Sequence, residues 1–168
     1  AAEFGPGVCF DLDAESAGSL AGELGWEVGS LEDALACDVV TCVTPGDQPV
    51  VREASLHARM HLNMLGADGP GKAEAEIEAV RSCRLFCDEW RQASHGGELT
   101  GAVEAGLVTR DQVTDLGAVL TGAAPGRQAP EEITLFDSTG LAIQDLALCL
   151  AVLEAHKAGT VKPQTIRL

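Results

Sequence analysis

The chain has 168 residues, enough for one domain with a substantial core, and 46% of them are hydrophobic. Lys and Arg total 11 against 26 Asp and Glu, which gives a formal net charge of -15. Such a surface repels phosphate backbones and anionic membranes, so we expect neither nucleic acid nor membrane as a partner. The apolar runs are too short for a membrane span, and the opening residues, AAEFGPG, do not predict a signal peptide.

Short strand-like segments alternate with helical segments along the chain. The sequence predicts strands at 8–11, 26–28, 38–43, 61–65, 84–87 and 133–136, helices at 14–24, 73–81, 89–94, 99–105 and 110–121, and a loop at 122–130. Ser30, followed by Asp33, predicts a capped helix start. The run 38–43 is apolar on both faces, which is typical of a central parallel strand. The alternation indicates an α/β fold, a Rossmann-like parallel sheet with flanking helices.

A further helix is expected after Ser138, and it is apolar on almost every side. Between Leu141 and Leu153 only Gln144 and Asp145 interrupt the apolar residues. A helix that is apolar all round is usually buried all round, and one sheet covers only one side of it. We therefore expect a second body, a missing domain or a second subunit, to cover the rest. The alternative is a central helix within a compact domain. The last residues, VKPQTIRL, predict a strand-like tail without an evident partner.

The cysteines and histidines do not predict a metal centre. Most of the six cysteines lie in apolar runs such as VCF and LALCL, where a cysteine behaves as a small buried hydrophobe. We expect reduced thiols in a cytoplasmic protein, with a disulfide or a metal site as the alternative. His57, His61 and His156 lack metal-ligand spacing, so we expect no metal. His95 could be catalytic, but a lone loop histidine is more often structural.

Polar residues follow the predicted strands at their carboxyl ends, where ligands bind in open α/β sheets. Asp11 ends the first strand and could accept hydrogen bonds from an adenosine ribose. Alternatively it caps the next helix, a role for which Asp13 competes. No glycine fingerprint stands about 20 residues before Asp11. Thr41 and Thr44 could line a nucleotide pocket, or they could simply belong to the Pro-Gly turn that follows.

Two later segments carry stronger signals. In HLNMLGADGPGK, Asp68 and Lys72 are the charged residues of a glycine-rich loop after a buried strand. A carboxylate in that position can act as an acid–base group, although an Asx-type turn would also explain it. In EITLFDSTGLAIQD, residues 137–140 lead from a strand into the apolar helix, and their amides could bind a polar ligand group. The alternative is helix capping by Ser138 or Asp137.

Four stretches together resemble one known family: VVTCVTPGDQPVV, HLNMLGADGPGKAE, FCDEWRQASHGGEL and, above all, EEITLFDSTGLAIQDLAL. They resemble the ornithine cyclodeaminase/μ-crystallin family, and within it most closely the alanine dehydrogenases of archaeal type. The resemblance covers essentially the whole chain. It implies an NAD(P)-dependent Rossmann domain joined to a separate dimerisation and substrate domain. The sequence HGGE, with Gly96, Gly97 and Glu98, resembles the dehydrogenase branch more than the cyclodeaminase branch.

The resemblance also implies roles for individual residues. Asp68 matches the family's catalytic aspartate, which activates water or moves a proton at the substrate nitrogen. Thr139 matches a position beside the substrate. Asp11 matches the acid on the adenosine ribose, which favours NAD over NADP as cofactor. The other positions that match dinucleotide contacts are Thr44, Leu62, Asn63, Met64, Leu65, Lys72 and Ser138.

The chain also departs from the family. Members are roughly twice as long, and neither the glycine fingerprint nor the Arg and Lys residues that hold the substrate carboxylate have counterparts here. The resemblance therefore implies that residues 1–158 are a partial NAD-binding domain, with the N-terminal part of the family fold absent. It implies that residues 159–168 are a tail that packs on the missing dimerisation and substrate domain.

For the complete protein, the resemblance implies NAD-dependent oxidative deamination of alanine or a similar small amino acid through an imine, in a homodimer. The isolated chain, lacking its N-terminal half, is expected to be inactive. Ornithine cyclodeamination and ketimine reduction are alternatives within the family. A non-catalytic ligand-binding protein of the μ-crystallin kind, or an inactive fragment, is the alternative of another class.

Overall fold

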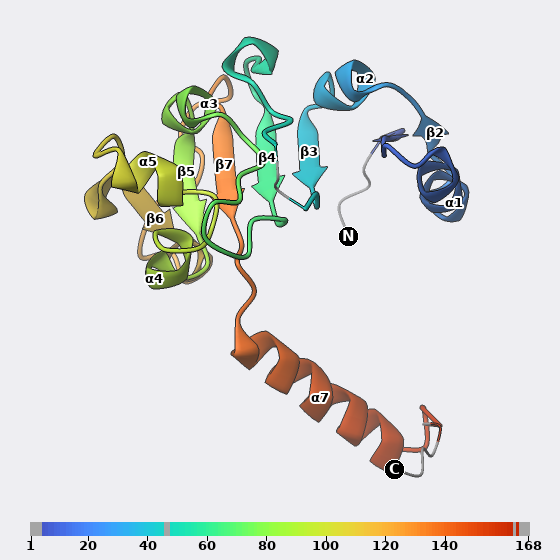
Figure 1. Cartoon of the computed structure of the whole chain (residues 1–168). Coiled ribbons are helices and arrows are strands. Elements are labelled where there is room, and N and C mark those ends of the chain that lie inside the picture. The colour runs from blue at the N-terminus through green and yellow to red at the C-terminus, as the bar shows by residue number, and fades with distance from the viewer. Residues whose placement is uncertain (1–4, 46–47, 163, 165–168) are drawn as a thin grey trace.

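A computed structural model of the chain describes residues 5–45, 48–162 and 164. Short strands and helices alternate through the described residues, which confirms the predicted α/β class (Figure 1). In chain order the elements are β1 (Val8–Cys9), α1 (Ala14–Leu24), β2 (Glu27–Val28), α2 (Leu31–Leu35), β3 (Val39–Cys42), a 3₁₀ turn (Glu53–Ser55), β4 (His61–Met64), α3 (Ile77–Arg81), β5 (Arg84–Cys87), α4 (Trp90–Ala93), α5 (Thr100–Glu104), a second 3₁₀ turn (Arg110–Gln112), β6 (Val113–Asp115), α6 (Leu116–Leu120), β7 (Thr134–Asp137) and α7 (Ala142–Lys157).

The strands form two separate sheets, and every pairing is parallel. The main sheet has the order β3-β4-β7-β5-β6, whereas β1 and β2 pair only with each other and lie beyond β3 (Figure 1). Within the described part of the chain, β1 and β3 each keep one edge without a strand neighbour. Because all strands of the main sheet run the same way, the loops that follow them meet at one edge.

The hydrophobic core lies on one face of the main sheet. In-register neighbours such as Val40, Leu62 and Leu135 share this face, and α3 and α5 cover it through Val80 and Ala102. Burying each large apolar side chain completely stabilises the fold by about 1.5–3 kcal/mol. This face fixes the strands, and therefore fixes where the loops at their carboxyl ends begin.

The other face of β3 is open, contrary to the prediction of a central strand. Val39 is 44% exposed and Thr41 is also exposed, whereas Val40 and Cys42 are buried. A strand that is apolar on both faces suits a position with neighbours on both sides. Among the described residues, however, β3 is the edge strand of the main sheet.

Residues 110–121 are not the single helix that the sequence predicts. They form a 3₁₀ turn, the short strand β6 and the helix α6. Val113 pairs with Leu85 of β5, and the β-branched pair Val113 and Thr114 suits a strand. Pairing with β5 therefore outweighs the local helical pattern.

Local capping follows the sequence closely. α1 spans the predicted residues, and Asp13 caps it by accepting hydrogen bonds from the amides of Glu15 and Ser16. Ser30 and Asp33 form the predicted capping box at the start of α2. Such a cap stabilises a helix by about 1 kcal/mol.

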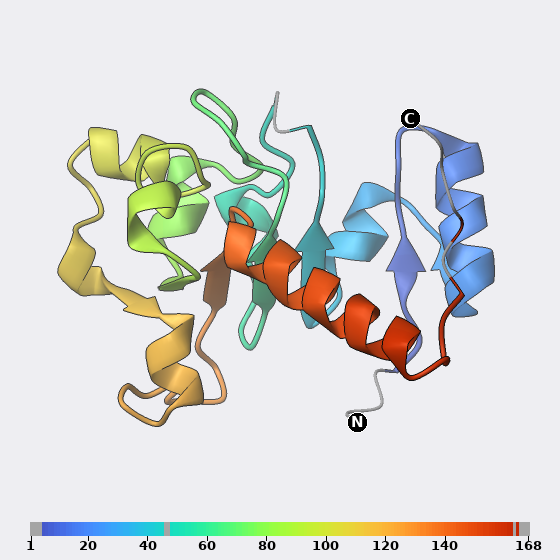
Figure 2. The ribbon, with the colours of Figure 1, turned by 90° about the horizontal axis from the view of Figure 1, so that it is seen from below.

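The helix α7 extends away from the sheet. Figures 1 and 2 both show it leaving the carboxyl end of β7 and running toward the side where β1 and β2 lie. None of its residues is buried, and Ile143 is 68% exposed. The alternative of a central helix in a compact domain is therefore wrong for the described chain. The covering body stays a prediction, and the strand-like tail falls largely on residues 163 and 165–168, outside the described residues.

Candidate functional site

The carboxyl ends of the main-sheet strands bring the predicted site residues to one edge. Figure 2 looks onto this edge from below. Thr44 follows β3, Asp68 lies in the loop between β4 and α3, and Thr139 follows β7. Asp11 follows β1 of the small sheet. The order of the strands therefore places three loops of the main sheet side by side, although they are far apart in the sequence.

Asp68 is paired with Lys72 in an exposed loop. The ammonium of Lys72 donates a hydrogen bond to Asp68 Oδ1 at 2.6 Å. This hydrogen bond, together with the positive charge of Lys72, lowers the pKa of Asp68 below its ordinary value. Asp68 is consequently a carboxylate at neutral pH, so it is suited to accept a proton first rather than to donate one. Because both side chains are exposed, the pair contributes little to stability.

Two glycines let the loop before α5 contact its neighbours. A Cβ on Gly97 would lie 2.6 Å from Asp137 Oδ2 and 2.6 Å from Thr139 Cγ2. A Cβ on Gly96 would lie 3.7 Å from the Cα of Gly69, one residue after Asp68. Gly96 and Gly97 therefore lie between the Asp68 loop and Thr139. The stretch Gly96–Gly97 thus joins the two predicted substrate positions.

Thr139 is held by polar contacts from the loop after β5 and from α4. Its amide donates to Asp88 Oδ2, and its hydroxyl donates to Gln92 Oε1 at 2.8 Å. Ser138 also donates its hydroxyl to Asp88. Gln92 in turn lines a hollow of about 510 Å³ together with Glu89, Arg91 and His95. The Thr139 hydroxyl therefore contacts one of the residues that line this hollow.

Residues 137–140 are not at the N-terminus of the apolar helix, contrary to the prediction, and the alternative in which Ser138 or Asp137 caps the helix is also wrong. α7 begins at Ala142, its N-cap is Leu141, and the side chain of Gln144 accepts the amide of Leu141. Gly140, with φ of 73°, turns the chain before the helix starts, a conformation that favours glycine. Residues 138–140 are therefore a loop rather than a helix N-terminus.

The residues that the family resemblance implies as dinucleotide contacts differ in exposure and in hydrogen-bond partners. Asp11 is exposed and accepts the amide of Asp13, so Asp13 and not Asp11 caps α1. The amide and hydroxyl of Thr44 both donate to Glu74 Oε1. The side chains of Leu62 and Met64 are fully buried in the core, whereas Asn63 is half-buried and Leu65 is exposed. Of these, Asp11 and Leu65 present side chains to solvent.

Three buried carboxyl groups, Glu74, Glu98 and Asp137, connect the loops of this edge. Glu74 accepts the amide of Gly66 at 2.8 Å, in addition to Thr44. Glu98 accepts the amides of Glu74 and Ala75, at 2.9 and 2.7 Å. Asp137 Oδ2 accepts the amide of Leu99, while Asp137 Oδ1 is buried without a hydrogen-bond partner among the described residues. The sequence patterns did not single out Glu74, and they offered Asp137 only as part of the loop 137–140 or as an alternative helix cap. The available signal for a buried carboxyl group was an acidic residue among small or apolar residues after a strand, as in KAEAE and LFDST.

Burial changes the acidity of two of these groups. Removal from water raises the pKa of Glu98 from 4.5 to about 7, against the lowering effect of its amide donors. Burial likewise raises the pKa of Asp137 from 3.8 to about 7. The negative charges of neighbouring carboxylates, Glu74 for Glu98, and Glu98 and Asp88 for Asp137, act in the same direction.

These shifts predict that stability falls as the pH rises. Glu98 and Asp137 bind protons more tightly in the folded chain, so their contribution to stability is complete below their unfolded pKa values and is lost through about pH 7. We expect a free energy of unfolding lower at about pH 8 than at about pH 5, by an amount on the order of a few kcal/mol. Exposed carboxyls with lowered pKa values, such as Asp13, act weakly in the opposite direction.

Urea unfolding at a series of pH values measures this dependence. General charge repulsion in an acidic chain also grows with pH, so Asp137→Asn is compared with the exposed Asp111→Asn. Only Asp137→Asn should make the free energy of unfolding depend less on pH. Equal slopes for both variants and the parent chain would contradict the assignment.

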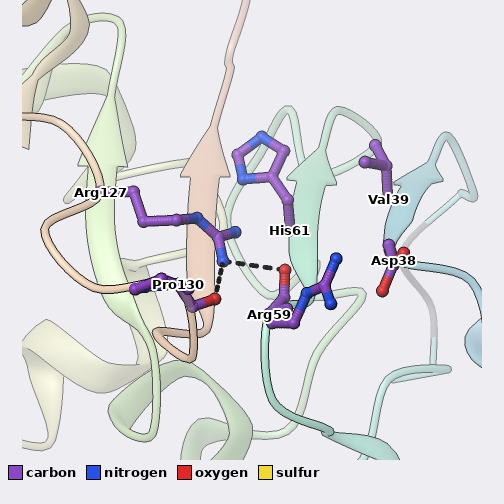
Figure 3. A pocket seen from close by; sticks show the side chains of 6 residues that line it. All are labelled: Asp38, Val39, Arg59, His61, Arg127 and Pro130. Atoms are coloured by element: carbon purple, nitrogen blue, oxygen red, sulfur yellow. Dashed lines mark hydrogen bonds between the residues drawn. The ribbon is translucent and has the colours of Figure 1, made fainter.

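A second hollow, of about 350 Å³, lies at the opposite edge of the sheet (Figure 3). Asp38, Arg59 and Pro130, which line it, all precede strands, so it faces the amino ends. The Arg127 guanidinium donates to the carbonyls of Arg59, Met60, Pro130 and Glu132 and to the Thr134 hydroxyl. Arg127 therefore ties chain segments together, and we assign the site to the carboxyl edge.

Other kinds of site receive no support from the described residues. They contain no group of three or more His, Cys, Asp or Glu side chains arranged to hold a metal ion. All six cysteines are unpaired thiols. No helix within the described ranges has the length and apolar character needed to cross a membrane.

Comparison with known proteins identifies similar chains. The model of the ornithine cyclodeaminase/mu-crystallin family matches residues 27–160. An alanine dehydrogenase from Archaeoglobus fulgidus is 44% identical over 124 residues, which cover 73% of this chain and 38% of that protein.

Two solved structures have the same fold. An archaeal alanine dehydrogenase dimer with bound NAD gives a TM-score of 0.81 at 37% identity, covering 92% of this chain and 49% of that one. The iminosuccinate reductase of Paracoccus denitrificans in complex with NAD+ gives 0.80 at 34% identity, covering 91% and 48%. The chain thus spans less than half the length of each of these relatives.

Proposed function

Because the chain belongs to the ornithine cyclodeaminase/mu-crystallin family, we propose that it forms the cofactor-binding part of an NAD-dependent dehydrogenase that deaminates a small amino acid, such as L-alanine, through an imine. The observation that carries this proposal is the convergence of Asp68, the Gly96–Gly97 loop and Thr139 at the carboxyl edge of a parallel sheet. An ionised carboxylate and a threonine on adjoining loops suit proton transfer at a small polar substrate.

The residues at this edge fit a dinucleotide. The exposed carboxylate of Asp11 suits the two hydroxyls of an adenosine ribose and would repel a 2′-phosphate, which favours NAD over NADP. A Cβ on Gly69 would meet no atom within 4 Å, so this loop leaves room beside Asp68. Thr44, Asn63, Leu65, Lys72 and Ser138 are the further contacts that we propose, with Leu62 and Met64 contributing through their main chain. NAD held by these residues would supply the hydride acceptor for oxidation at the substrate Cα.

The chain's own residues supply orientation and proton transfer. Lys72 holds Asp68 ionised, so Asp68 can accept a proton from the water that adds to the imine carbon. The same carboxyl then returns the proton to the nitrogen. As the C–N bond breaks and ammonia leaves, the Asp68 carboxylate accepts the hydroxyl proton, and the C=O bond of the keto acid forms. Thr139, fixed by Asp88 and Gln92, lies where it can orient the substrate.

The part of the relatives that this chain does not cover explains the exposure of α7 and the presence of the tail 159–168. We propose that the complete protein contains a dimerisation and substrate domain, and that α7 and the tail 159–168 pack against it. Residues 1–158 then form the partial NAD-binding domain. We also propose a cytoplasmic location, since every cysteine is a free thiol. On this account turnover requires the complete polypeptide.

Formation of NADH tests the proposed reaction. The natural polypeptide that contains this chain is incubated with NAD and L-alanine, and NADH and ammonia are measured together. We expect one NADH for each ammonia released. Ammonia from ornithine without net NADH would instead indicate a cyclodeaminase, because cyclodeamination recycles the cofactor. Imine reduction by NADH without the reverse reaction would indicate a ketimine reductase, and ligand binding without turnover would indicate a carrier protein.

A further inference from the structure

The side chain of Glu74 closes the loop that carries Asp68. Glu74 Oε2 accepts the amide of Gly66, which joins the two ends of the segment 66–74. Its other oxygen accepts the amide and the hydroxyl of Thr44. Both oxygens of one fully buried carboxyl group are therefore used to fix the ends of two neighbouring loops.

Glu98, in the loop before α5, fixes main-chain amides in the same way as Glu74. Its carboxyl group accepts the main-chain amides of Glu74 and Ala75, and both of its oxygens take part. Glu98 directly follows Gly97, which lies against Thr139. The loop that contacts Thr139 is thereby joined to the base of the Asp68 loop through a side chain that is 3% exposed.

We propose that Glu74 and Glu98 are positioning residues for the reaction: their carboxylates hold the Asp68 loop, Thr44 and the Gly96–Gly97 loop in one fixed arrangement. This inference rests on the proposed function for its catalytic consequence. A carboxylate is required at both positions because every partner is a donor. A glutamine would turn an NH2 group toward an amide N–H and lose one of the accepting oxygens.

Asp137 provides a contrast within the same cluster. Only its Oδ2 accepts main-chain amides, and its Oδ1 has no hydrogen-bond partner in the described structure. An asparagine there keeps the accepting oxygen and places the NH2 group where no donor opposes it. The geometry therefore predicts that Glu74→Gln and Glu98→Gln are damaging and that Asp137→Asn is tolerated.

The need for ionised carboxylates also predicts a dependence on pH. Burial raises the pKa of Glu98 to about 7. The groups that surround it are Glu74 on the Asp68 loop, Asp137 on β7 and Cys42 on β3, and Asp88 faces Asp137. We expect turnover by the parent protein to fall as the pH decreases below about 7, even though the fold becomes more stable there.

The experiment uses the natural polypeptide and its variants Glu98→Gln, Glu74→Gln and Asp137→Asn, with the exposed Glu104→Gln as matched control. We measure kcat and KM across pH. Glu98→Gln and Glu74→Gln should lower kcat by about 10- to 100-fold, and Asp137→Asn by less than about 3-fold. Glu98→Gln should also change the acid limb of the kcat profile. Equal effects at all three buried acids, or an unchanged profile in Glu98→Gln, would overturn the proposal.

A second measurement is independent of turnover. Amide hydrogen exchange is measured for segments 43–45, 65–76 and 94–99 in the parent protein and in Glu98→Gln. Faster exchange in 65–76 and 94–99, with exchange in β4 and β5 unchanged, would support the positioning role. This conclusion would hold even if the natural polypeptide oxidised no amino acid, a result that would contradict the proposed reaction alone. Exchange unchanged in these segments, or uniformly faster throughout the chain, overturns the positioning role whether or not the enzyme is active.

Discussion

Replacing Asp68 with asparagine should lower turnover by at least about 100-fold while leaving NAD affinity almost unchanged. The asparagine keeps the size of the side chain and can still accept a hydrogen bond from Lys72, but it cannot take a proton from the attacking water. Because the side chain is 66% exposed and its ion pair is weak, folding should be unaffected. Steady-state NADH formation gives kcat, and calorimetric titration gives the affinity for NAD.

The control for this variant is Asp111→Asn, which makes the same chemical change within the second 3₁₀ turn, at the opposite end of the main sheet from β3. It should keep the parent kcat. A rate in Asp68→Asn that matches Asp111→Asn would show that Asp68 does not take part in proton transfer. A parallel loss of NAD affinity would assign Asp68 to cofactor binding instead.

Replacing Gly66 with alanine should destabilise the fold by about 3 kcal/mol and disrupt the site. The new Cβ would lie 2.1 Å from the carbonyl oxygen of Thr44 and 2.5 Å from Glu74 Oε1. The Thr44 oxygen is a main-chain atom, and the Glu74 carboxyl group is fully buried and held by hydrogen bonds from Thr44 and Gly66. Neither neighbour can move away easily, so the loops after β3 and β4 must separate. The hydrogen bond from Gly66 to Glu74 would be strained at the same time. Urea unfolding measures the loss of stability.

Gly69→Ala, three residues along the same loop, is the matched control for stability. Its Cβ would meet no atom within 4 Å, and its φ is not in the left-handed region. The free energy of unfolding should therefore stay within about 1 kcal/mol of the parent value. If both glycine variants were equally stable, the close approach of Gly66 to Thr44 would be wrong.

Those parts of the fold that depend on local signals could be predicted from the sequence. The residues of α1, its Asp13 cap and the Ser30–Asp33 capping box follow from side chains that act within one helical turn. The parallel sheet follows from the regular alternation of elements. Residues 110–121 could not be predicted in this way, because β6 exists only through its pairing with β5, a contact that no local pattern encodes.

The residues of the candidate site also differ in whether local sequence signals reveal them. Asp11, Asp68 and Thr139 carry recognisable chemistry next to strand ends and could be placed at the carboxyl edge. Glu74 and Asp137 were not recognised as a cluster with Glu98, because most of the hydrogen bonds that connect them come from main-chain amides of other loops. Such partners leave no trace in residue type. The sequence predicted that a body other than the sheet covers part of the apolar helix, but it also led us to expect the sheet on one side, and no residue of α7 is buried.

Hydrogen exchange with and without NAD tests the placement of the site most directly. In the natural polypeptide, we predict that NAD slows exchange in segments 8–13, 41–45 and 61–72 at the carboxyl edge. Segments 52–60 and 125–132, beside the hollow at the amino ends of the strands, should be unchanged. Protection confined to that hollow, or no protection by NAD at any concentration, would contradict the account.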